Sequence, residues 1–442
     1  MKLDVRNPAQ GVLVAFVTLS LIGTLLLRLP WALNDGVEMA WFDTLFWGTS
    51  ASTITGLTTV DISAFSAFGE VVILVLMQVG GFGIMTIGSV LALVMSRRLG
   101  IRRRLLAQTE LGAAIEMGEM RSLLQAIARF TLCAEAVLAI VLFSVFTLRH
   151  DVAPGRAAYS AVFHAVSAWN NAGIALRSDS LAAYGSDPLV LLPVSVVFVV
   201  GGLGFPILVE FVRRVPRRRW ALNTRITLLA TAVLLVIGPL LVLVLEWSNE
   251  ATLGPMGAPH KLLTAWFQGA TPRTAGFHTF DIAAQREPTL NLQTALMFIG
   301  AGPASTSGGI KVTTFAVLGF AMWSEVRGDP DVNVFRRRLS PAAIRQAMTM
   351  ALLAVGVVFG TGILLSSVSD FSFTRTLFES ASAFGTTGLS TGVTAGAPAV
   401  GQWALLLMML VGRVGPMTFV TALALRETRR AYRFAEERPI IG

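Results

Sequence analysis

Long apolar runs alternate along the chain with short segments rich in glycine, serine and threonine. The runs come in pairs, at about 11–29 and 68–95, 122–148 and 188–213, 225–247 and 291–327, and 342–367 and 401–425. A transmembrane helix needs about 20 mainly apolar residues, and several of these runs reach or exceed that length. The pattern therefore predicts an all-α polytopic membrane protein.

A polar segment lies between the two runs of every pair, and its four copies share one register. In each copy an aromatic residue precedes a glycine by ten positions. The copies are "FWGTSASTITGLTTVD" from Phe46, "FHAVSAWNNAGIALRSD" from Phe163, "WFQGATPRTAGFHTFD" from Trp266 and "FESASAFGTTGLS" from Phe378. The second runs also share a small-residue signature, which reads "VGGFG", "VGGLG", "IGAGP" and "VGRVGP". Four matches in register predict a fourfold internal repeat.

Each unit is interpreted as a span, a short half-helix, the glycine segment and a second span. This gives eight full spans plus four re-entrant half-helices around a pseudo-fourfold pore. The predicted units are 1–100, 101–214, 215–340 and 341–442. The second unit begins with an amphipathic cytosolic connector, 101–125, which either contacts a regulatory partner or lies on membrane lipids. The fourth unit ends in a basic cytosolic tail.

The glycine segments are candidates for an ion-binding site. Irregular backbone is tolerated in the hydrocarbon region only where it is buried in protein or lines an aqueous path. Four such segments on one axis would present a ring of carbonyl oxygens, which replaces the hydration shell of a monovalent cation, and glycine permits the unusual φ values that this requires. The alternative is that the segments are ordinary extracellular turns. The predicted ion-binding residues are Ile54, Thr55, Gly56, Asn171, Ala172, Gly173, Thr274, Ala275, Gly276, Thr386, Thr387 and Gly388.

Composition and charge agree with a membrane protein. The 442 residues are 54% hydrophobic and only 14% charged, whereas ordinary globular domains carry about 25% charged residues. The formal net charge of +9 is concentrated in arginine-rich stretches between the units, such as 97–104 and 213–219. This is the positive-inside pattern, so both termini are predicted to be cytosolic, with the chain in the cytoplasmic membrane and no nucleic-acid partner. The run 11–27 has no cleavage site after it and is interpreted as a retained span.

Several enzymatic and metal-binding classes are disfavoured. The single cysteine, Cys133, excludes an intrachain disulfide. Four histidines occur without an HExxH motif or a Cys/His cluster, and no Walker motif is present. A membrane-embedded enzyme would need a nucleophile and a base, or metal ligands, at membrane depth, and no such pair is found. A conventional secondary transporter usually has two repeats. We therefore predict no enzyme activity and no covalent cofactor.

The motifs "TITGL", "NNAGI", "TAGF" and "TTGL" resemble the four filter segments of the Trk/Ktr/HKT superfamily of potassium transporters. The resemblance covers essentially the whole chain, and one span before the first filter is typical of the Ktr-type membrane subunit. It implies potassium uptake by a homodimer with one pore per protomer, with sodium as an activator left open. It also implies a cytosolic ring of nucleotide-binding (KtrA-like) subunits, so that nucleotide binds only to the partner. In some plant members serine replaces the first filter glycine and accompanies sodium preference, so Gly56 favours potassium. A sodium-permeable or weakly selective transporter is the alternative.

The segment "GAGPASTSGGIKVTTF" (300–315) interrupts the second span of the third unit. It resembles the intramembrane loop (about 300–312) that the family holds beneath the filter as a gate, the alternative being a kink without function. Lys311 either interacts with the pore or the regulatory ring, or extends to the cytosolic interface, and we favour the second. The predicted gate residues are Gly302, Pro303, Ser305, Thr306, Ser307, Gly308, Gly309 and Lys311.

Arg413 lies inside the second span of the fourth unit and matches an arginine that the family places just below the filter. A buried arginine at this depth costs roughly 2.5–3.5 kcal/mol or more, so it needs a partner or an aqueous cavity. We predict that it is a barrier to cations in the pore, the alternative being structural pairing with Glu379 or a backbone carbonyl. Asp61, Asp179 and Asp281 follow the first three glycines and form either an acidic vestibule or turns and helix caps.

Overall fold

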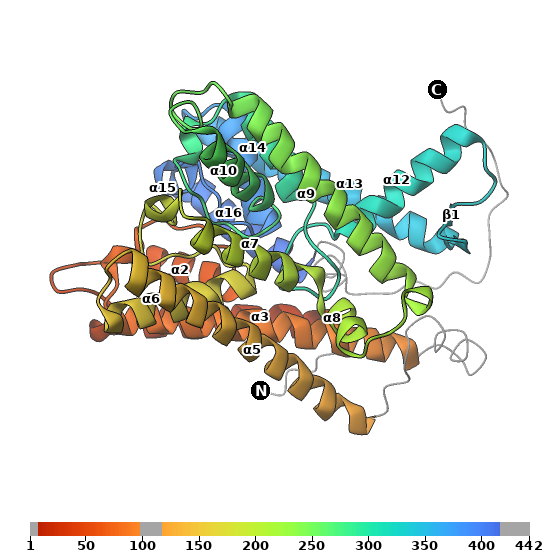
Figure 1. Cartoon of the computed structure of the whole chain (residues 1–442), viewed down its shortest axis with the longest axis horizontal. Helices are drawn as coiled ribbons and strands as arrows, with labels where there is room; N and C mark the ends of the chain where they lie inside the picture. Colours follow the sequence, from red (N-terminus) through yellow and green to blue (C-terminus); the bar gives the residue numbers. More distant parts are fainter. Residues whose placement is uncertain (1–7, 98–116, 416–442) are drawn as a thin grey trace.

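The computed structural model describes residues 8–97 and 117–415, and this part of the chain is mainly helical, with irregular segments between the helices (Figure 1). Its strands are the two-residue pair β1 (Asn333–Val334) and β2 (Arg337–Arg338), which are antiparallel. The predicted helical class is therefore confirmed. Most of the predicted connector, 101–125, and the whole basic tail from 416 lie outside the described residues.

One long apolar helix lies near the start of each of the four predicted units. These helices are α1 (Pro8–Leu27), α5 (Met117–Arg149), α9 (Leu222–Glu246) and α13 (Pro341–Val368). Each contains a stretch long and apolar enough to cross a membrane. On α5, Leu132, Val137 and Ile140 are 60–66% exposed. Such outward apolar side chains are what a lipid-facing surface requires.

A shorter helix follows each long one and packs against it. These helices are α2 (Trp41–Thr53), α6 (Pro154–Asn170), α10 (Ala258–Ala270) and α14 (Phe373–Gly385). Their C-terminal halves are buried. Three of them end at a left-handed residue directly after the last turn, whereas α10 stops at Ala270. Pro272 accounts for the early stop, because it has no N–H with which to continue the helix.

The second helices of the units differ from one another. They are α3 (Ala67–Arg97), α7 with α8 (Pro188–Leu203, Phe205–Val212), α11 with α12 (Glu287–Phe298, Val312–Arg327) and α16 (Ala399–Val414). The apolar run 188–213 forms two helices and not one straight helix, because α7 and α8 meet at 101° around Gly204. A straight helix would drive the ring of Pro206 into the carbonyl four residues earlier. Within the described residues, four helices are long and apolar enough to be spans, and the bent pair α7–α8 makes a fifth candidate if it is counted as one span. The predicted eight spans therefore stay a prediction.

The remaining elements are short. They are the 3-10 turns η1 (Pro30–Ala32), η2 (Ile62–Ala64), η3 (Ala182–Tyr184), η4 (Arg217–Arg219) and η5 (Ile282–Ala284), and α15 (Val393–Gly396). The β1–β2 pair connects α12 to α13, and Figure 1 shows the ends of these two helices next to β1 lying to one side of the other helices.

The buried apolar core joins each short helix to its neighbours in the next unit. Ile54 of the first unit clusters with Phe163 and Ala172 of the second, and residues of α6 cluster with Phe267 of the third. A third cluster joins residues of α11 in the third unit to α14 in the fourth and also contains Phe46 of the first. The core therefore packs around the polar segments at the C-terminal ends of the short helices.

Candidate functional site

The four glycine segments meet one another in the folded chain. A Cβ atom built on each glycine would collide with the backbone carbonyl oxygen that directly precedes the glycine of the next segment. The contacts are Gly56 to Ala172 (2.4 Å), Gly173 to Ala275 (2.8 Å), Gly276 to Thr387 (2.1 Å) and Gly388 to Thr55 (2.4 Å). The order is first to second, second to third, third to fourth and fourth to first, so the contacts close a cycle. We call this cycle of backbone contacts the glycine ring.

The four segments share one backbone conformation. Each has a positive φ at the glycine and at the residue two positions before it. The values are 57° and 84° at Ile54 and Gly56, 57° and 65° at Asn171 and Gly173, 71° and 79° at Thr274 and Gly276, and 48° and 90° at Thr386 and Gly388. Positive φ is uncommon for a residue with a side chain, so its fourfold repetition indicates a constraint on the direction of the neighbouring carbonyls.

The structure brings together all twelve predicted ion-binding residues. The eight that are not glycine are at most 2% exposed. The hydroxyl of Thr55 pairs with that of Thr53 at 2.8 Å, and the hydroxyl of Thr274 donates to Ser307 Oγ at 2.6 Å. The side-chain oxygens of Thr386 and Thr387 are buried without a hydrogen-bond partner. Carbonyl and hydroxyl oxygens of this kind are hard ligands that suit an alkali cation.

The small-residue signature has a packing function beside the ring. A Cβ on Gly80, Gly201 or Gly412 would lie 1.9–2.3 Å from a carbonyl oxygen of the neighbouring short helix. Those oxygens belong to Ser52, Trp169 and Phe384, each two residues before the left-handed residue. Glycine therefore lets the second helix approach the end of the short helix closely.

The interruption at 299–311 is an ordered loop. Its ends are joined by hydrogen bonds from Gly300 N to Ile310 O (2.7 Å) and from Val312 N to Ala301 O (3.0 Å). Gly302 N donates to Gly202 O at 2.8 Å, which ties the loop to α7. Seven of the predicted gate residues lie in this loop between its two end contacts, and Lys311 lies at its exit.

Thr306 and Ser307 connect the loop to residues of the second, third and fourth predicted units. The Ser307 hydroxyl contacts the Asn171 side chain (3.1 Å) and the Thr274 hydroxyl, so it bridges the second and third glycine segments. The Thr306 carbonyl accepts a hydrogen bond from Arg413 of the fourth unit. A Cβ on Gly308 would lie 2.4 Å from Thr386 Oγ1. The loop is thus packed directly against the glycine ring.

Arg413 is buried, with 3% of its surface exposed. Its guanidinium donates to the carbonyl oxygen of Thr306 and, at 3.2 Å, to that of Gly80 in the first unit. The alternative of pairing with Glu379 is wrong, because Glu379 is bound by other groups, whereas pairing with backbone carbonyls is what the structure has. Arg413 therefore joins the loop to α3.

Lys311 turns back into the loop, where its ammonium donates to the Ser307 carbonyl. The favoured expectation that it extends to the cytosolic interface is therefore not what the structure has. Arg413 and Lys311 hold consecutive carbonyls, those of Thr306 and Ser307, so two side-chain cations lie against the same dipeptide.

Glu379 holds the segment that follows the fourth glycine. Its fully buried carboxylate accepts hydrogen bonds from Ser390 Oγ (2.5 Å), Thr391 N (3.1 Å) and Thr394 N (2.9 Å), and also from the Thr394 hydroxyl. None of these donors is charged. A buried carboxylate without a cation is stable only when donors of this kind satisfy it.

We expect Glu379→Ala to lower the thermal stability of the purified protein strongly. The change leaves several buried donors without an acceptor, and each costs about 1–3 kcal/mol, so a loss of about 3 kcal/mol or more follows. The melting temperature in detergent measures it, with Asp370→Ala, at an exposed position, as the control. Equal melting temperatures for the two variants would contradict this role.

The three aspartates that follow the first three ring glycines make local contacts that stabilise turns. Asp61 accepts from Ser63 N (2.8 Å) and Asp281 from Ala283 N (2.9 Å), which caps η2 and η5. Asp179 forms an ion pair with Arg177 at 2.7 Å, and this hydrogen-bonded guanidinium lowers the pKa of the Asp179 carboxyl. Of the two alternatives for these aspartates, an acidic vestibule or turns and helix caps, the structure has the second for all three.

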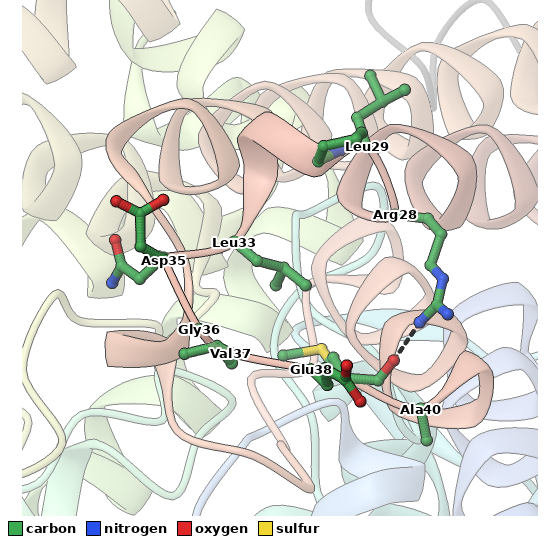
Figure 2. Close-up of a pocket in the computed structure, with 11 residues that line it drawn as sticks. Arg28, Leu29, Leu33, Asp35, Gly36, Val37, Glu38 and Ala40 are labelled. Carbon is green, nitrogen blue, oxygen red and sulfur yellow. Dashed lines mark hydrogen bonds between the residues drawn. The ribbon is translucent and has the colours of Figure 1, made fainter.

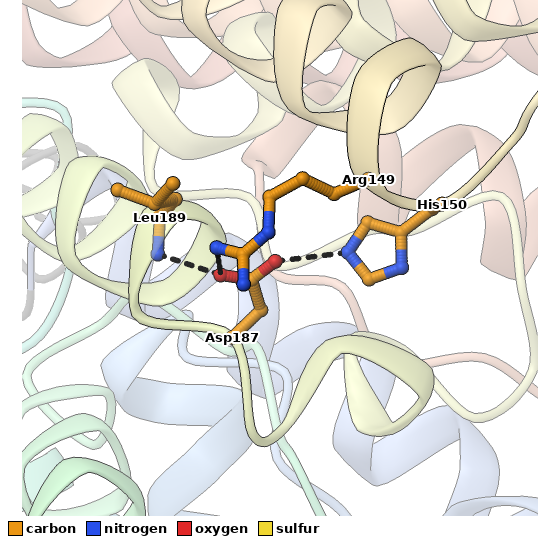
Figure 3. Close-up of polar contacts among 4 residues, drawn as sticks. All are labelled: Arg149, His150, Asp187 and Leu189. Carbon is orange, nitrogen blue, oxygen red and sulfur yellow. Dashed lines mark hydrogen bonds and ion pairs between the residues drawn. The ribbon is translucent and has the colours of Figure 1, made fainter.

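Two polar features outside the ring are visible in the close-ups. Figure 2 shows an open hollow lined by eleven residues between Arg28 and Ala40, where Arg28 donates to the Met39 carbonyl; it contains none of the predicted site residues. Figure 3 shows three contacts of the Asp187 carboxylate. It accepts a hydrogen bond from Leu189 N (2.9 Å) and contacts the side chains of Arg149 (3.1 Å) and His150 (3.0 Å). This carboxylate joins the end of α5 to the start of α7.

Sequence reasoning missed two charged side chains next to the ring. Glu135 on α5 is 6% exposed and receives amide hydrogen bonds from Gln78 (3.2 Å) and from Asn170 (3.4 Å), the last residue of α6. Arg273 precedes Gly276 by three positions and is 7% exposed. A charge within an apolar run is the signal that would have identified Glu135.

Comparison with known proteins identifies the family. The model of the family described as "TrkH: Cation transport protein" matches residues 1–430. The chain is 35% identical to Ktr system potassium uptake protein B of Bacillus subtilis, over 95% of this chain and 94% of the relative. The chain belongs to the TrkH family of cation transport proteins. The predicted family is therefore confirmed, and as a member of this family the chain is a membrane transport protein and not an enzyme.

Two further relatives of this TrkH-family chain bear on its function. Ktr system potassium uptake protein B of Vibrio alginolyticus is 35% identical, over 95% of this chain and 93% of the relative. Potassium/sodium uptake protein NtpJ of Enterococcus hirae is 31% identical, over 100% of this chain and 99% of the relative. The crystal structure of the potassium transporter TrkH from Vibrio parahaemolyticus shares the fold, with a TM-score of 0.74 and 18% identity, over 96% of this chain and 86% of that one.

Proposed function

We propose that this chain takes up potassium across the cytoplasmic membrane and that the ion passes, without its water shell, through the glycine ring. The observation that carries the proposal is the closed cycle of contacts between the four glycines and the preceding carbonyls. Two relatives named for potassium uptake, each 35% identical over most of the chain, support the choice of ion. In this proposal the four units surround one pore in each protomer.

The short helices favour a cation at the ring. The C-terminal end of a helix carries a partial negative charge, and all four short helices end within a few residues of a ring glycine. Their C-terminal dipoles would therefore add to the carbonyl oxygens in compensating an ion for its lost water. The twelve ring residues are the selectivity filter in this account.

The loop at 299–311 is proposed as the gate. It is packed against the ring through Ser307 and Gly308, and the side-chain cations of Arg413 and Lys311 lie against it. A positive charge beside the ion path lowers cation occupancy there. With the loop in this position the path is closed, and displacement of the loop would remove both the obstruction and the contact that fixes Arg413.

The loop is the element through which a regulatory subunit would act. The resemblance to Ktr-type membrane subunits supports a homodimer, with a cytosolic nucleotide-binding ring as partner. Two relatives carry "Ktr system" in their names, which agrees with a membrane subunit of a larger system. Both termini would then lie on the cytosolic side.

A transporter of both sodium and potassium is the second candidate. The relative named for potassium and sodium uptake, which is 31% identical over the whole chain, favours it. Uptake by potassium-starved cells, measured with increasing external sodium, separates the two candidates. Potassium uptake that falls in proportion to added sodium would favour the second.

The proposed function is tested with the purified chain in liposomes. We expect potassium-loaded liposomes to take up radioactive rubidium only when they contain the chain, and we expect a cytosolic nucleotide-binding partner to change the rate. Liposomes with the chain that take up no more rubidium than empty ones, with and without the partner, would contradict the proposal.

In the same assay we expect Ser307→Ala to raise the basal rate by about threefold. The change removes the hydroxyl that ties the loop to two glycine segments, and a typical hydrogen bond contributes about 0.5–1.5 kcal/mol. Thr314→Ala is the matched control, since its hydroxyl has no hydrogen bond among the described residues. A rate equal to that of the control would show that this contact does not hold the gate.

A further inference from the structure

Arg273 is a buried cation with almost no hydrogen bonds. Its side chain is 7% exposed and lies directly before the left-handed Thr274 of the third glycine segment. Its two contacts are at the limit of hydrogen-bond length, 3.5 Å to the carbonyl and 3.4 Å to the hydroxyl of Thr231. Its Nε has no partner. No ion pair of the described residues includes it.

Other arginines in this chain are better compensated. Arg177 has the carboxylate of Asp179 at 2.7 Å. Arg413 is as buried as Arg273, yet it donates to two carbonyls and lies over the ring of Phe16. A buried charge that is neither paired nor hydrogen-bonded is strongly unfavourable. The position of Arg273 is therefore explained only if a further group accepts its N–H bonds.

A small cavity faces the Arg273 side chain. Its wall is otherwise mainly apolar and includes Phe198, Leu235 and Ala301, with Thr231 as a polar member. The space leaves about 10 Å³ for the centre of a water-sized particle, which is about the least room that holds one water molecule. A monatomic anion is only slightly larger than a water molecule. A carboxylate or phosphate is too large for the cavity.

We propose that this cavity binds one monatomic anion, such as chloride, between the Arg273 guanidinium and the Thr231 hydroxyl. Both groups can donate hydrogen bonds, and an apolar wall excludes competing water. A water molecule would accept one or two hydrogen bonds but would leave the positive charge uncompensated. An anion of this size satisfies the donors and the charge together.

The site connects to the transport path through the third unit. Ala301 of the cavity wall belongs to the loop, and Gly202, which also borders the cavity, accepts the hydrogen bond from Gly302 N. A bound anion neutralises a positive charge three residues from Gly276 and so favours a cation in the ring. This consequence for transport rests on the proposed function, whereas anion binding itself does not.

The first test measures binding without transport. The melting temperature of the purified chain in detergent is followed while sodium gluconate is replaced by sodium chloride or bromide at constant ionic strength. We expect the melting temperature to rise by a few degrees with halide for the unchanged chain and for Arg156→Gln, an exposed arginine, but not for Arg273→Gln. Because Arg273→Gln can fail to fold, Thr231→Val is the second variant, with an expected loss of halide affinity of at least about tenfold, or about 1.4 kcal/mol.

A halide effect that is the same in all variants, or no halide effect in the unchanged chain, overturns the proposal. Bromide-soaked crystals give an independent readout, with an anomalous peak expected beside Arg273 and Thr231. Rubidium uptake, measured in chloride and in gluconate, then separates the proposed anion site from the proposed transport function. A halide-dependent melting temperature without any rubidium uptake would keep the anion site and reject the proposed function.

Discussion

Gly276→Ser lowers the preference for potassium over sodium by at least about tenfold, which corresponds to about 1.4 kcal/mol. The added Cβ would lie 2.1 Å from the Thr387 carbonyl oxygen, and the residue has a φ of +79°. A side chain in that conformation costs on the order of 1–3 kcal/mol before any collision is counted. The backbone of the third or fourth segment must therefore shift, and a ring of carbonyls with one displaced member fits a dehydrated potassium ion less well.

The measurement is rubidium uptake into liposomes in competition with sodium and potassium. Gly56→Ser is expected to behave similarly, since its Cβ would lie 2.4 Å from the Ala172 oxygen. Gly257→Ser is the matched control, because a Cβ there meets nothing within 4 Å and its φ is −68°. Unchanged selectivity in both ring variants, with normal folding, would count against the assignment of the ring as the filter.

Arg413→Ala raises the maximal rate of rubidium uptake by about tenfold and makes it less dependent on a regulatory partner. The guanidinium holds the Thr306 carbonyl and bridges it to Gly80, so its removal frees the loop. It also removes a positive charge near the path, and a unit charge about 10 Å from an ion contributes roughly 1.7 kcal/mol at an effective dielectric constant of about 20. Both effects act in the same direction.

Arg225→Ala is the control for this variant. Arg225 also donates to two backbone carbonyls, those of Arg217 and Arg218, but it does so at the surface. An Arg413→Ala chain that melts several degrees lower and transports no faster would show that the residue serves only folding. If Arg413→Ala has a normal melting temperature and an unchanged uptake rate, Arg413 neither acts as a barrier to cations nor holds the loop in place.

The sequence located the ring because the requirement of its backbone is visible in residue identity. Gly56, Gly173, Gly276 and Gly388 adopt positive φ, and each is closely approached by another carbonyl. Both requirements select glycine, so the fourfold register of glycine within apolar surroundings was sufficient evidence. The interruption at 299–311 was predictable for a similar reason, since Gly302 and Pro303 do not suit the interior of a helix.

The contacts of the charged side chains were not predictable. Arg413 bonds to carbonyls 107 and 333 positions away, and backbone carbonyls are present at every residue, so no pattern in the sequence marks the partner. The same holds for Lys311, whose preference for the loop carbonyl of Ser307 depends on how the loop folds. Arg273 was passed over because it stands in a polar segment, where a charge is unremarkable.

The break at Gly204 shows a limit of repeat matching. The signatures "VGGFG" and "VGGLG" are nearly identical, yet α3 continues through Gly83 while α7 ends at Leu203. The difference lies two residues beyond Gly204, where Pro206 cannot be accommodated in a continuous helix. The four predicted units therefore share the glycine segment and differ in the helices that follow it.

The central claim is that an alkali ion loses its water within the glycine ring. Crystals of the chain grown in rubidium or thallium test this directly, by anomalous scattering. We expect a peak enclosed by the carbonyl oxygens of Thr55, Ala172, Ala275 and Thr387. Anomalous peaks located elsewhere in the chain, with none inside that ring, would contradict the account.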